Sequence, residues 1–358
     1  MSRFFSARYA DLTPYTPGEQ PQNRVYLKLN TNESPFPPSP GVAAAVEAQS
    51  RNLALYSDPE CVKLRAKMAQ VYGLEPDQVM MGNGSDEVLN LAFMAFADEA
   101  HPLAFADVTY GFYPVFAQVN HIPYTEISLK EDFSLDPADY IGVNKTVVIA
   151  NPNAPTGLYL PLGDIERIVK SNPDNVVIVD EAYIDFGGES AVTLLDRCKN
   201  LLVVGTFSKS RSMAGARLGF GFGSPKLIAD LNTLRYSTNP YNINRMTDAA
   251  GLAALEENGY YMNNCQIIIE NRVWFTEQLR RLGFRVLDSQ TNFVFAESPK
   301  IAGGELYRQL KENGILVRHF EKDRLTNFNR ITIGTREQMQ TLINKIAEIM
   351  EENDHENC

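Results

Sequence analysis

The sequence has few of the features that mark several classes of protein. Its four cysteines (Cys61, Cys198, Cys265 and Cys358) are scattered over 358 residues, with no CxxC pair or metal-type spacing. This usage excludes a disulfide framework and indicates a reducing compartment. No stretch approaches the roughly 18 uninterrupted apolar residues of a membrane-spanning helix, and the first residues, MSRFFSARYADL, lack the apolar core of a signal peptide. We therefore expect a cytoplasmic protein with no membrane partner.

Positive charge is scarce as well. The chain has 33 Lys and Arg against 44 Asp and Glu, which gives a net charge of −11. An acidic protein of this kind is a poor match for nucleic acid or an anionic membrane as its main partner. A negative net charge is still compatible with local basic pockets that bind small anions.

Motifs for metals and nucleotides are missing. The four histidines (His101, His121, His319 and His355) form no HxH or HExxH pattern, so no metal site is predicted. No GxxxxGK[ST] loop is present, which argues against a nucleotide hydrolase. The segment GNGSDE does not complete GxGxxG, because Glu87 stands where the third glycine should be. A dinucleotide-binding fold is therefore disfavoured.

Between about residues 55 and 255, short apolar runs alternate with helical patterns. In one helical pattern, Leu162, Ile165, Ile168 and Val169 fall on one face. Buried strands that alternate with helices predict an α/β fold, with a mainly parallel sheet covered on both faces. The runs are QVMMG (78–82), LAFAD (103–107), TVVIA (146–150), VVIVD (176–180), LLVVG (201–205) and ARLGFGFG (216–223).

The C-terminal part has a different pattern. A long helix is predicted at roughly 257–282, followed by the strands NFVFAE, ILVRHF and RITIG around a helix near 303–313, and then a final amphipathic helix. Residues 11–40 are rich in turn formers. We predict an N-terminal arm (1–30), a large α/β domain (31–260) and a small α+β domain (261–358). Residues 31–50 are counted with the large domain, with packing on the small domain as the alternative.

Polar residues gather at the predicted strand ends, where ligands sit in open α/β sheets. Ser85 and Asp86 follow two glycines and open an apolar helix, whose free N–H groups can bind phosphate; the same residues also suit an ordinary turn and N-cap. Asp180 follows a fully apolar strand, and Tyr183 comes three residues later.

Lys209 is the most informative of these residues. A lysine at a strand end is usually a solvated surface group, but small residues follow this one, and Ser208 and Arg217 supply anion-binding groups on either side. A partly desolvated lysine near cationic groups favours its neutral amine, which a Schiff base with an aldehyde requires. Together with Asp180, which would keep a pyridine nitrogen protonated, this set suggests pyridoxal phosphate.

At this point the chain resembles the fold type I pyridoxal-phosphate aminotransferases and, within them, the histidinol-phosphate aminotransferase branch. The resemblance implies a mainly parallel seven-stranded sheet flanked by helices, a smaller α+β domain, an N-terminal arm and a homodimer with shared active sites. The motifs occur in the family's order along nearly the whole chain: LTPYTPG, KLNTNESPFPPSP, YSDPE, GNGSDEVL, NPNAPTG, VDEAYIDF, TFSKSRSMAGARLG, PYN and RITIGTREQ.

Carried over to this sequence, the resemblance gives each residue a role. Lys209 would form the Schiff base and then move the proton of the substrate. Asp180 would pair with the pyridinium nitrogen, Tyr183 would hydrogen-bond the phenolic oxygen, and Tyr110 would stack on the ring. The phosphate would be held by Ser208, Arg217, the amides of Ser85 and Asp86, and Tyr56 of the other subunit.

One position departs from the family. An asparagine usually stands directly before the Pro-Thr-Gly of the NPNAPTG segment and bonds the phenolic oxygen, whereas this chain has Ala154 there and Asn153 one residue earlier. Either Asn153 reaches over after a small backbone adjustment, or Tyr183 acts alone. We expect Asn153 to take the role.

Two arginines carry the expectation about the substrate. Arg330 matches the arginine that binds the substrate carboxylate in general aminotransferases, and Arg318 lies on the preceding predicted strand. Two arginines suit a dianionic phosphate. The resemblance implies a phosphate cradle of Arg318, Arg330, Tyr15 and, from the partner subunit, Tyr241. The alternative is that Arg318 pairs with a surface acid.

The predicted reaction is L-histidinol phosphate plus 2-oxoglutarate to imidazole acetol phosphate plus L-glutamate, a step of histidine biosynthesis. One alternative is an aromatic or broad-specificity aminotransferase, and another is a phosphothreonine decarboxylase of the same superfamily. A cofactor-binding regulator is disfavoured, because the acidic chain has no residues to spare for a DNA-binding module.

Overall fold

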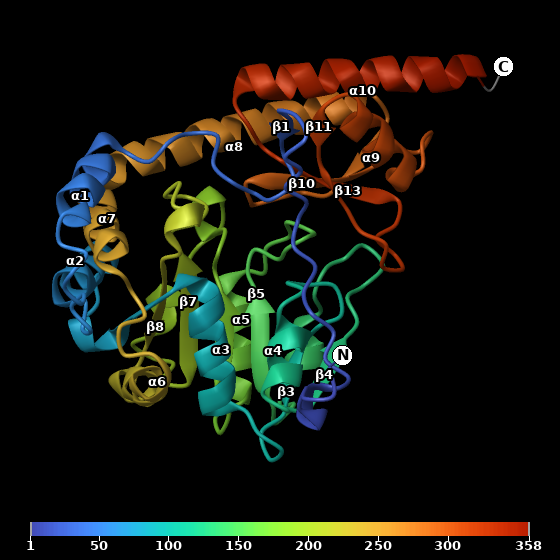
Figure 1. Ribbon diagram of the computed structural model, residues 1–358. Coiled ribbons are helices and arrows are strands. Elements are labelled where there is room, and N and C mark those ends of the chain that lie inside the picture. The colour runs from blue at the N-terminus through green and yellow to red at the C-terminus, as the bar shows by residue number, and fades with distance from the viewer. Residues whose placement is uncertain (1, 357–358) are drawn as a thin grey trace.

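The computed structural model describes residues 2–356, so Cys358 lies outside the described residues, as does the side chain of His355. A seven-stranded sheet forms its centre, in the order β2-β8-β7-β6-β5-β3-β4 (Figure 1). β8 is antiparallel to both of its neighbours, and the other pairs are parallel. The strands are β2 (Val79–Gly82), β3 (Leu103–Ala106), β4 (Tyr124–Ile127), β5 (Thr146–Ala150), β6 (Val177–Asp180), β7 (Leu201–Thr206) and β8 (Gly219–Gly223).

This architecture confirms the predicted mainly parallel sheet. The six predicted apolar runs are all strands, because each supplies the continuous hydrophobic stretch that a strand buried on both faces needs. The strand β4 was not predicted. It lies at the edge of the sheet and its residues are exposed or half-buried, so it shows no apolar run.

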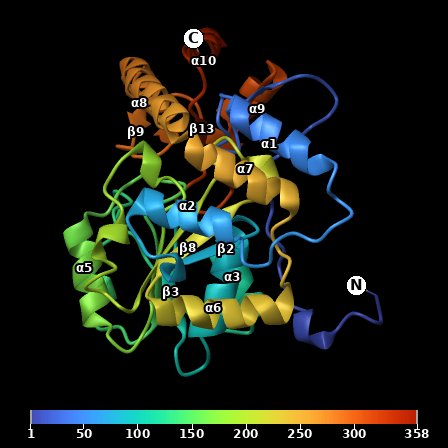
Figure 2. The ribbon, with the colours of Figure 1, turned by 90° about the vertical axis from the view of Figure 1, so that its left-hand side faces the viewer.

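Helices cover both faces of the sheet (Figure 2). Alternate residues of one strand point to opposite faces: Val177 and Val179 share a core with Ile168 of α5, whereas Ile178 shares a second core with Phe93 of α3. The helices are α1 (Pro40–Ser50), α2 (Val62–Tyr72), α3 (Gly84–Phe96), α4 (Tyr113–Val119), α5 (Leu162–Ser171), α6 (Pro225–Thr238) and α7 (Arg245–Glu256). Short 3-10 helices lie at Ala7–Tyr9, Pro76–Gln78, Pro137–Tyr140, Ile184–Phe186, Ala191–Leu194 and Ala214–Ala216.

The C-terminal part forms a second unit above the large sheet, with α8 and α10 running along its top (Figure 1). Its four-stranded antiparallel sheet has the order β12-β13-β10-β9. The elements are α8 (Asn258–Arg281), β9 (Arg285–Val286), β10 (Phe293–Glu297), α9 (Gly303–Glu312), β11 (Ile315–Leu316), β12 (Arg318–His319), β13 (Phe328–Thr332) and α10 (Arg336–Glu356).

The prediction of one strand over ILVRHF was wrong. The segment divides at Val317 into β11, which pairs in parallel with β1 (Leu27–Lys28) of the arm, and β12, which joins the antiparallel sheet. The arm supplies a partner strand that lies almost 300 residues earlier in the sequence, and no local sequence pattern predicts such a partner.

The segment after the arm packs on both units. α1 packs on α7, the backbone N–H of Gly41 donates to Glu257 Oε2 (3.1 Å), and that of Ser39 donates to the Tyr261 hydroxyl (2.9 Å). The division into arm, large domain and small domain at residues 30 and 260 stays a prediction.

Within residues 2–356, no helix is long and apolar enough to cross a membrane.

Candidate active site

Two adjoining cavities open at the carboxyl ends of the central strands. The smaller has a volume of about 110 Å³ and the larger of about 370 Å³. Tyr110, Ala154, Tyr183 and Lys209 line both of them. The smaller is also lined by Ser85, Asp86, Asp180, Ser208 and Arg217, and the larger by Tyr15, Arg318 and Arg330.

Lys209 lies just beyond the end of β7, where the two cavities meet. Its Nζ donates to the carbonyl of Thr31 (3.3 Å). Burial, with a smaller contribution from the positive charge of Arg330, lowers the pKa of Lys209 to about 8. About a tenth of the amine is therefore neutral at pH 7, far more than for an exposed lysine, and can act as a nucleophile or a base.

Asp180 ends β6 with its carboxylate almost completely buried (5% exposed). Its Oδ2 accepts from the Tyr113 hydroxyl (2.8 Å), and its Oδ1 accepts from the backbone N–H of Ala182 (3.2 Å). Burial raises the pKa of Asp180 to about 6. Sequence reasoning missed Tyr113, which lies in the same segment as Tyr110, because nothing local links it to an aspartate 67 residues later.

The other end of the smaller cavity is suited to an anion. Arg217 Nη2 donates to Asp86 Oδ2 (3.0 Å), and the Tyr110 hydroxyl donates to Asp86 Oδ1 (2.8 Å). Ser208 is buried beside them, and its Oγ accepts from Thr206 Oγ1 (2.9 Å). The Arg217 side chain is 47% exposed and lines the cavity beside this ion pair.

Two glycines make room for this end of the cavity. Gly84 has φ +77°, and a Cβ added to it would lie 2.5 Å from Arg217 Nη2. A Cβ added to Gly219 would lie 2.2 Å from the backbone nitrogen of Ser85. Only residues without a side chain allow the start of α3 to approach β8 and Arg217 this closely.

Asn153, which was expected to bond the phenolic oxygen, has its amide bonded within its own loop in the structure. Thr109 Oγ1 donates to Asn153 Oδ1 (2.8 Å), and Asn153 Nδ2 donates to the Val108 carbonyl (2.9 Å) and to Thr156 Oγ1 (3.0 Å). These bonds hold the amide within its own loop, so the side chain does not line either cavity. Ala154 lines both of them instead.

Tyr183 has a partner that the sequence did not reveal. Its hydroxyl accepts a hydrogen bond from Asn32 Nδ2 (2.9 Å), and its ring packs edge-on against Phe293 (5.1 Å between centroids). Burial is the main cause that raises the pKa of Tyr183. The tyrosine is therefore held as a neutral phenol at the wall of the site.

The two arginines enter the larger cavity from neighbouring strands. Arg318 and Arg330 are direct partners in the register of β12 and β13. Among residues 2–356 Arg318 makes no ion pair with an acidic side chain that the structure describes; it donates to the carbonyls of Thr16 (3.1 Å) and Pro17 (3.2 Å). Arg330 donates to the Asn30 carbonyl (3.2 Å), and its Nε is buried without a partner among the described residues. The N-terminal arm thus brings Tyr15 to both cations.

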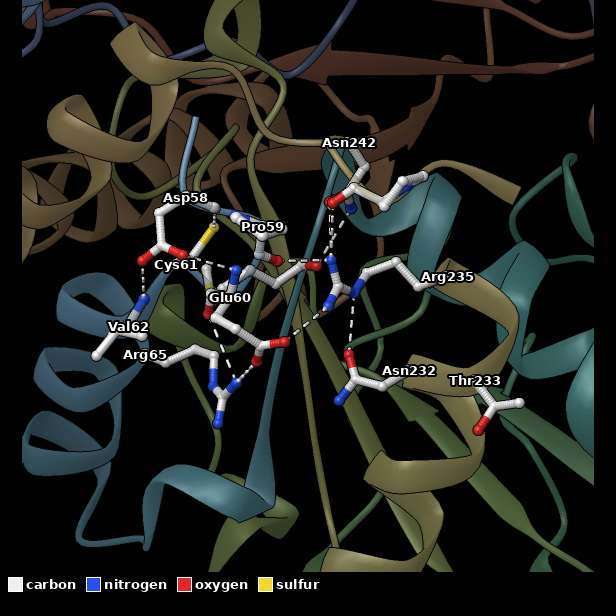
Figure 3. A network of polar contacts seen from close by, with 12 residues as sticks. Asp58, Pro59, Glu60, Cys61, Val62, Arg65, Asn232, Thr233, Arg235 and Asn242 are labelled. Atoms are coloured by element: carbon white, nitrogen blue, oxygen red, sulfur yellow. Dashed lines mark hydrogen bonds and ion pairs between the residues drawn. The ribbon is translucent and has the colours of Figure 1, made fainter. Parts of the chain in front are cut away.

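Tyr56 and Tyr241 lie outside the cavities of their own chain. Their rings stack (4.4 Å between centroids) and are 78% and 44% exposed. Figure 3 shows the buried Arg235 of α6, which donates to the Pro59 carbonyl (2.8 Å) and to the side-chain Oδ1 of Asn242 (3.5 Å), in the two segments that carry these tyrosines. The pair is a stacked aromatic projection on the surface.

Comparison with known proteins agrees with this geometry. Residues 24–346 match the family model of aminotransferase class I and II. The histidinol-phosphate aminotransferase of Marinomonas sp. (strain MWYL1) is 50% identical over 346 residues, which cover 96% of this chain and 98% of that protein. The chain belongs to the histidinol-phosphate aminotransferase family. Histidinol-phosphate aminotransferase 1 of Pseudomonas fluorescens (strain Pf0-1) is 46% identical over 350 residues, 98% of this chain and all of that one.

The fold of this family member matches solved structures too. The crystal structure of histidinol-phosphate aminotransferase from Sinorhizobium meliloti, in complex with pyridoxal-5'-phosphate, has a TM-score of 0.87 at 22% identity, over 98% of this chain and 100% of that one. This likeness confirms the predicted fold type I architecture.

The residues present fit pyridoxal phosphate, the cofactor of this aminotransferase family. The buried Asp180 carboxylate has an open side towards the cavity and would be compensated by a cationic ring nitrogen. At the other end, two glycines leave space beside Arg217, Ser208 and the first N–H groups of α3. Lys209 lies between these ends with a pKa that suits attack on an aldehyde.

Proposed function

We propose that this enzyme transfers the amino group of L-histidinol phosphate to 2-oxoglutarate, giving imidazole acetol phosphate and L-glutamate in histidine biosynthesis. The observation that carries the proposal is the pair Arg318 and Arg330, which lies in the cavity that Lys209 and Tyr15 also line. Two guanidinium groups match the charge of a phosphate monoester. The same pair would bind the carboxylate of glutamate in the other half of the reaction.

Pyridoxal phosphate, when bound, supplies an electron sink that stabilises negative charge on the substrate Cα. Lys209 Nζ would hold the cofactor at its aldehyde carbon, and its free amine would take the Cα proton of the substrate as a general base and return it as an acid. The Asp180 carboxylate would keep a proton on the ring nitrogen. Tyr113 holds that carboxylate in position through its hydroxyl.

The remaining residues bind and orient. Ser208, Arg217 and the amides of Ser85 and Asp86 would hold the cofactor phosphate. Tyr110 would pack on the ring, and the Tyr183 hydroxyl would donate to its phenolic oxygen. Tyr15 would close the substrate phosphate site beside Arg318 and Arg330.

We also propose a cytoplasmic homodimer with shared sites. Tyr56 and Tyr241 are exposed and stacked, and Arg235 binds residues in the segments that carry both of them. An exposed aromatic pair outside the cavities of its own chain suits a contribution to a neighbouring copy. Tyr56 would reach the cofactor phosphate of the neighbour, and Tyr241 the substrate phosphate. The buried free cysteines Cys61, Cys198 and Cys265 are compatible with a reducing compartment.

A half-reaction tests the proposal. Protein loaded with pyridoxal phosphate is mixed with one amino donor and no keto acid, and the visible absorbance of the cofactor is followed. We expect rapid conversion by histidinol phosphate at low concentration and slow conversion by phenylalanine or aspartate. Conversion mainly by phenylalanine or aspartate would contradict the proposed substrate. Release of CO₂ from phosphothreonine would contradict the proposed reaction. The variant Lys209→Ala, as control, should show no conversion.

A further inference from the structure

The segment 30–32 runs between three side chains of the proposed site. The Asn30 carbonyl accepts from Arg330 Nη2 (3.2 Å), and the Thr31 carbonyl accepts from Lys209 Nζ (3.3 Å). Asn32 Nδ2 then donates to the Tyr183 hydroxyl (2.9 Å). Three successive residues thus touch three different functional side chains, and Asn32 is the one that does so through its own side chain.

The amide of Asn32 is fixed in one orientation. Thr332 Oγ1 donates to Asn32 Oδ1 (3.1 Å) and accepts from the Asn32 backbone N–H (3.0 Å). With Oδ1 facing Thr332, the N–H donors of the amide face Tyr183. Asn292 Nδ2 donates to the Asn32 carbonyl (2.9 Å), and the residue is only 1% exposed. Its φ of +56° is one that asparagine accepts more readily than most residues.

This orientation decides what the Tyr183 hydroxyl does. Its oxygen accepts from Asn32, and among the described residues it makes no other hydrogen bond, so its hydrogen is left to point into the cavity. An N–H that donates to a phenol also makes the phenol O–H a stronger donor. Ala154, which lines the same cavities, offers no polar side-chain group of its own.

We propose that Asn32 is a positioning residue for the reaction: it holds the Tyr183 hydroxyl as a hydrogen-bond donor towards the bound cofactor, in a chain where Ala154 provides no amide for that role. The proposal rests on the proposed function, because it needs Lys209 and Tyr183 to face pyridoxal phosphate. Asn32 touches Tyr183 and acts through it. Thr332 of β13 links this contact to the strand that carries Arg330.

The test compares Asn32→Gly with a matched control. Glycine keeps the positive φ and removes only the side chain; Asn144→Gly makes the same change at φ +51°, on an exposed residue that lines neither cavity. We expect Asn32→Gly to slow the half-reaction with histidinol phosphate about tenfold, the effect of one weakened hydrogen bond. The pH midpoint of the cofactor's visible absorbance should rise, because a weaker donor at the phenolic oxygen leaves more negative charge to hold a nearby proton. Asn144→Gly should change neither.

A double-mutant cycle separates positioning from a general structural effect. If Asn32 acts through Tyr183, Asn32→Gly should lower the rate of the half-reaction by less than about twofold when Tyr183 has already been replaced by Phe. Equal losses in both backgrounds, or an unchanged absorbance midpoint, would overturn the proposal. Thr332→Val, which removes the hydroxyl that orients the amide, should raise the midpoint as well and serves if Asn32→Gly folds poorly. The absorbance midpoint needs only bound cofactor, so it tests Asn32 even if histidinol phosphate proves not to be the substrate.

Discussion

Arg318 and Arg330 lie directly opposite one another on β12 and β13, and each donates to backbone carbonyls of the N-terminal arm. Neither is neutralised by a carboxylate in these contacts, so both positive charges remain available to a ligand. Burial lowers the pKa of Arg330, which shows that its charge is held at a cost in free energy. An anionic substrate group would offset that cost.

Replacing Arg318 should therefore affect the phosphate substrate most. We expect Arg318→Ala to lower kcat/KM for histidinol phosphate about 10- to 100-fold, because a charge-assisted hydrogen bond is lost. Conversion of phenylalanine should fall far less, since Arg330 alone can bind a single carboxylate. The control is Arg285→Ala on β9 of the same sheet, which removes an exposed arginine that pairs with Glu297. Equal losses for both substrates would mean that the phosphate cradle is wrongly placed.

The buried Asp180 predicts a pH dependence of stability. Its pKa is raised to about 6 in the folded protein, above the unfolded value of about 3.9. The stability that this shift contributes is present below about pH 4 and is lost as pH rises through about 6. For cofactor-free protein, the free energy of unfolding of wild type relative to Asp180→Asn should thus fall by up to about 3 kcal/mol between pH 4 and 7. Urea unfolding at several pH values measures it, and a flat difference would contradict the assignment.

Gly219 should be intolerant of any side chain. A Cβ there would lie 2.2 Å from the backbone nitrogen of Ser85 and 2.3 Å from the carbonyl carbon of Gly84, so the start of α3 would have to move. We expect Gly219→Ala to destabilise the protein by about 1–3 kcal/mol and to weaken binding of pyridoxal phosphate, measured by fluorescence titration. Gly215→Ala is the control, because a Cβ there meets nothing within 4 Å. Unchanged cofactor affinity in Gly219→Ala would argue against a phosphate site at α3.

Mixing two inactive variants tests the shared site. In a hybrid of Lys209→Ala and Tyr56→Ala subunits, one site carries both changes and the other carries neither if Tyr56 acts on the neighbouring copy. Activity should therefore appear after the two variants are mixed and allowed to exchange subunits. A mixture of Lys209→Ala with the double variant is the control and should stay inactive. A mixture no more active than its separate components would place Tyr56 outside the site of the partner.

Much of this protein follows from local sequence. The apolar runs become the strands of the large sheet because they are long enough and apolar enough to be buried on both faces. The polar residues that follow them, such as Asp180 and Lys209, meet at one edge because the carboxyl ends of parallel strands share it.

The tertiary structure decided the contacts that join distant segments. The pairing of β1 with β11, the bond from Asn32 to Tyr183 and the bond from Tyr113 to Asp180 each link residues that no local period relates. The same holds for the hydrogen bonds of the Asn153 side chain with Thr109 and Val108. A sequence pattern fixes which face of a strand or helix is buried, whereas the direction of a polar side chain in a loop depends on which donors and acceptors the rest of the chain places beside it.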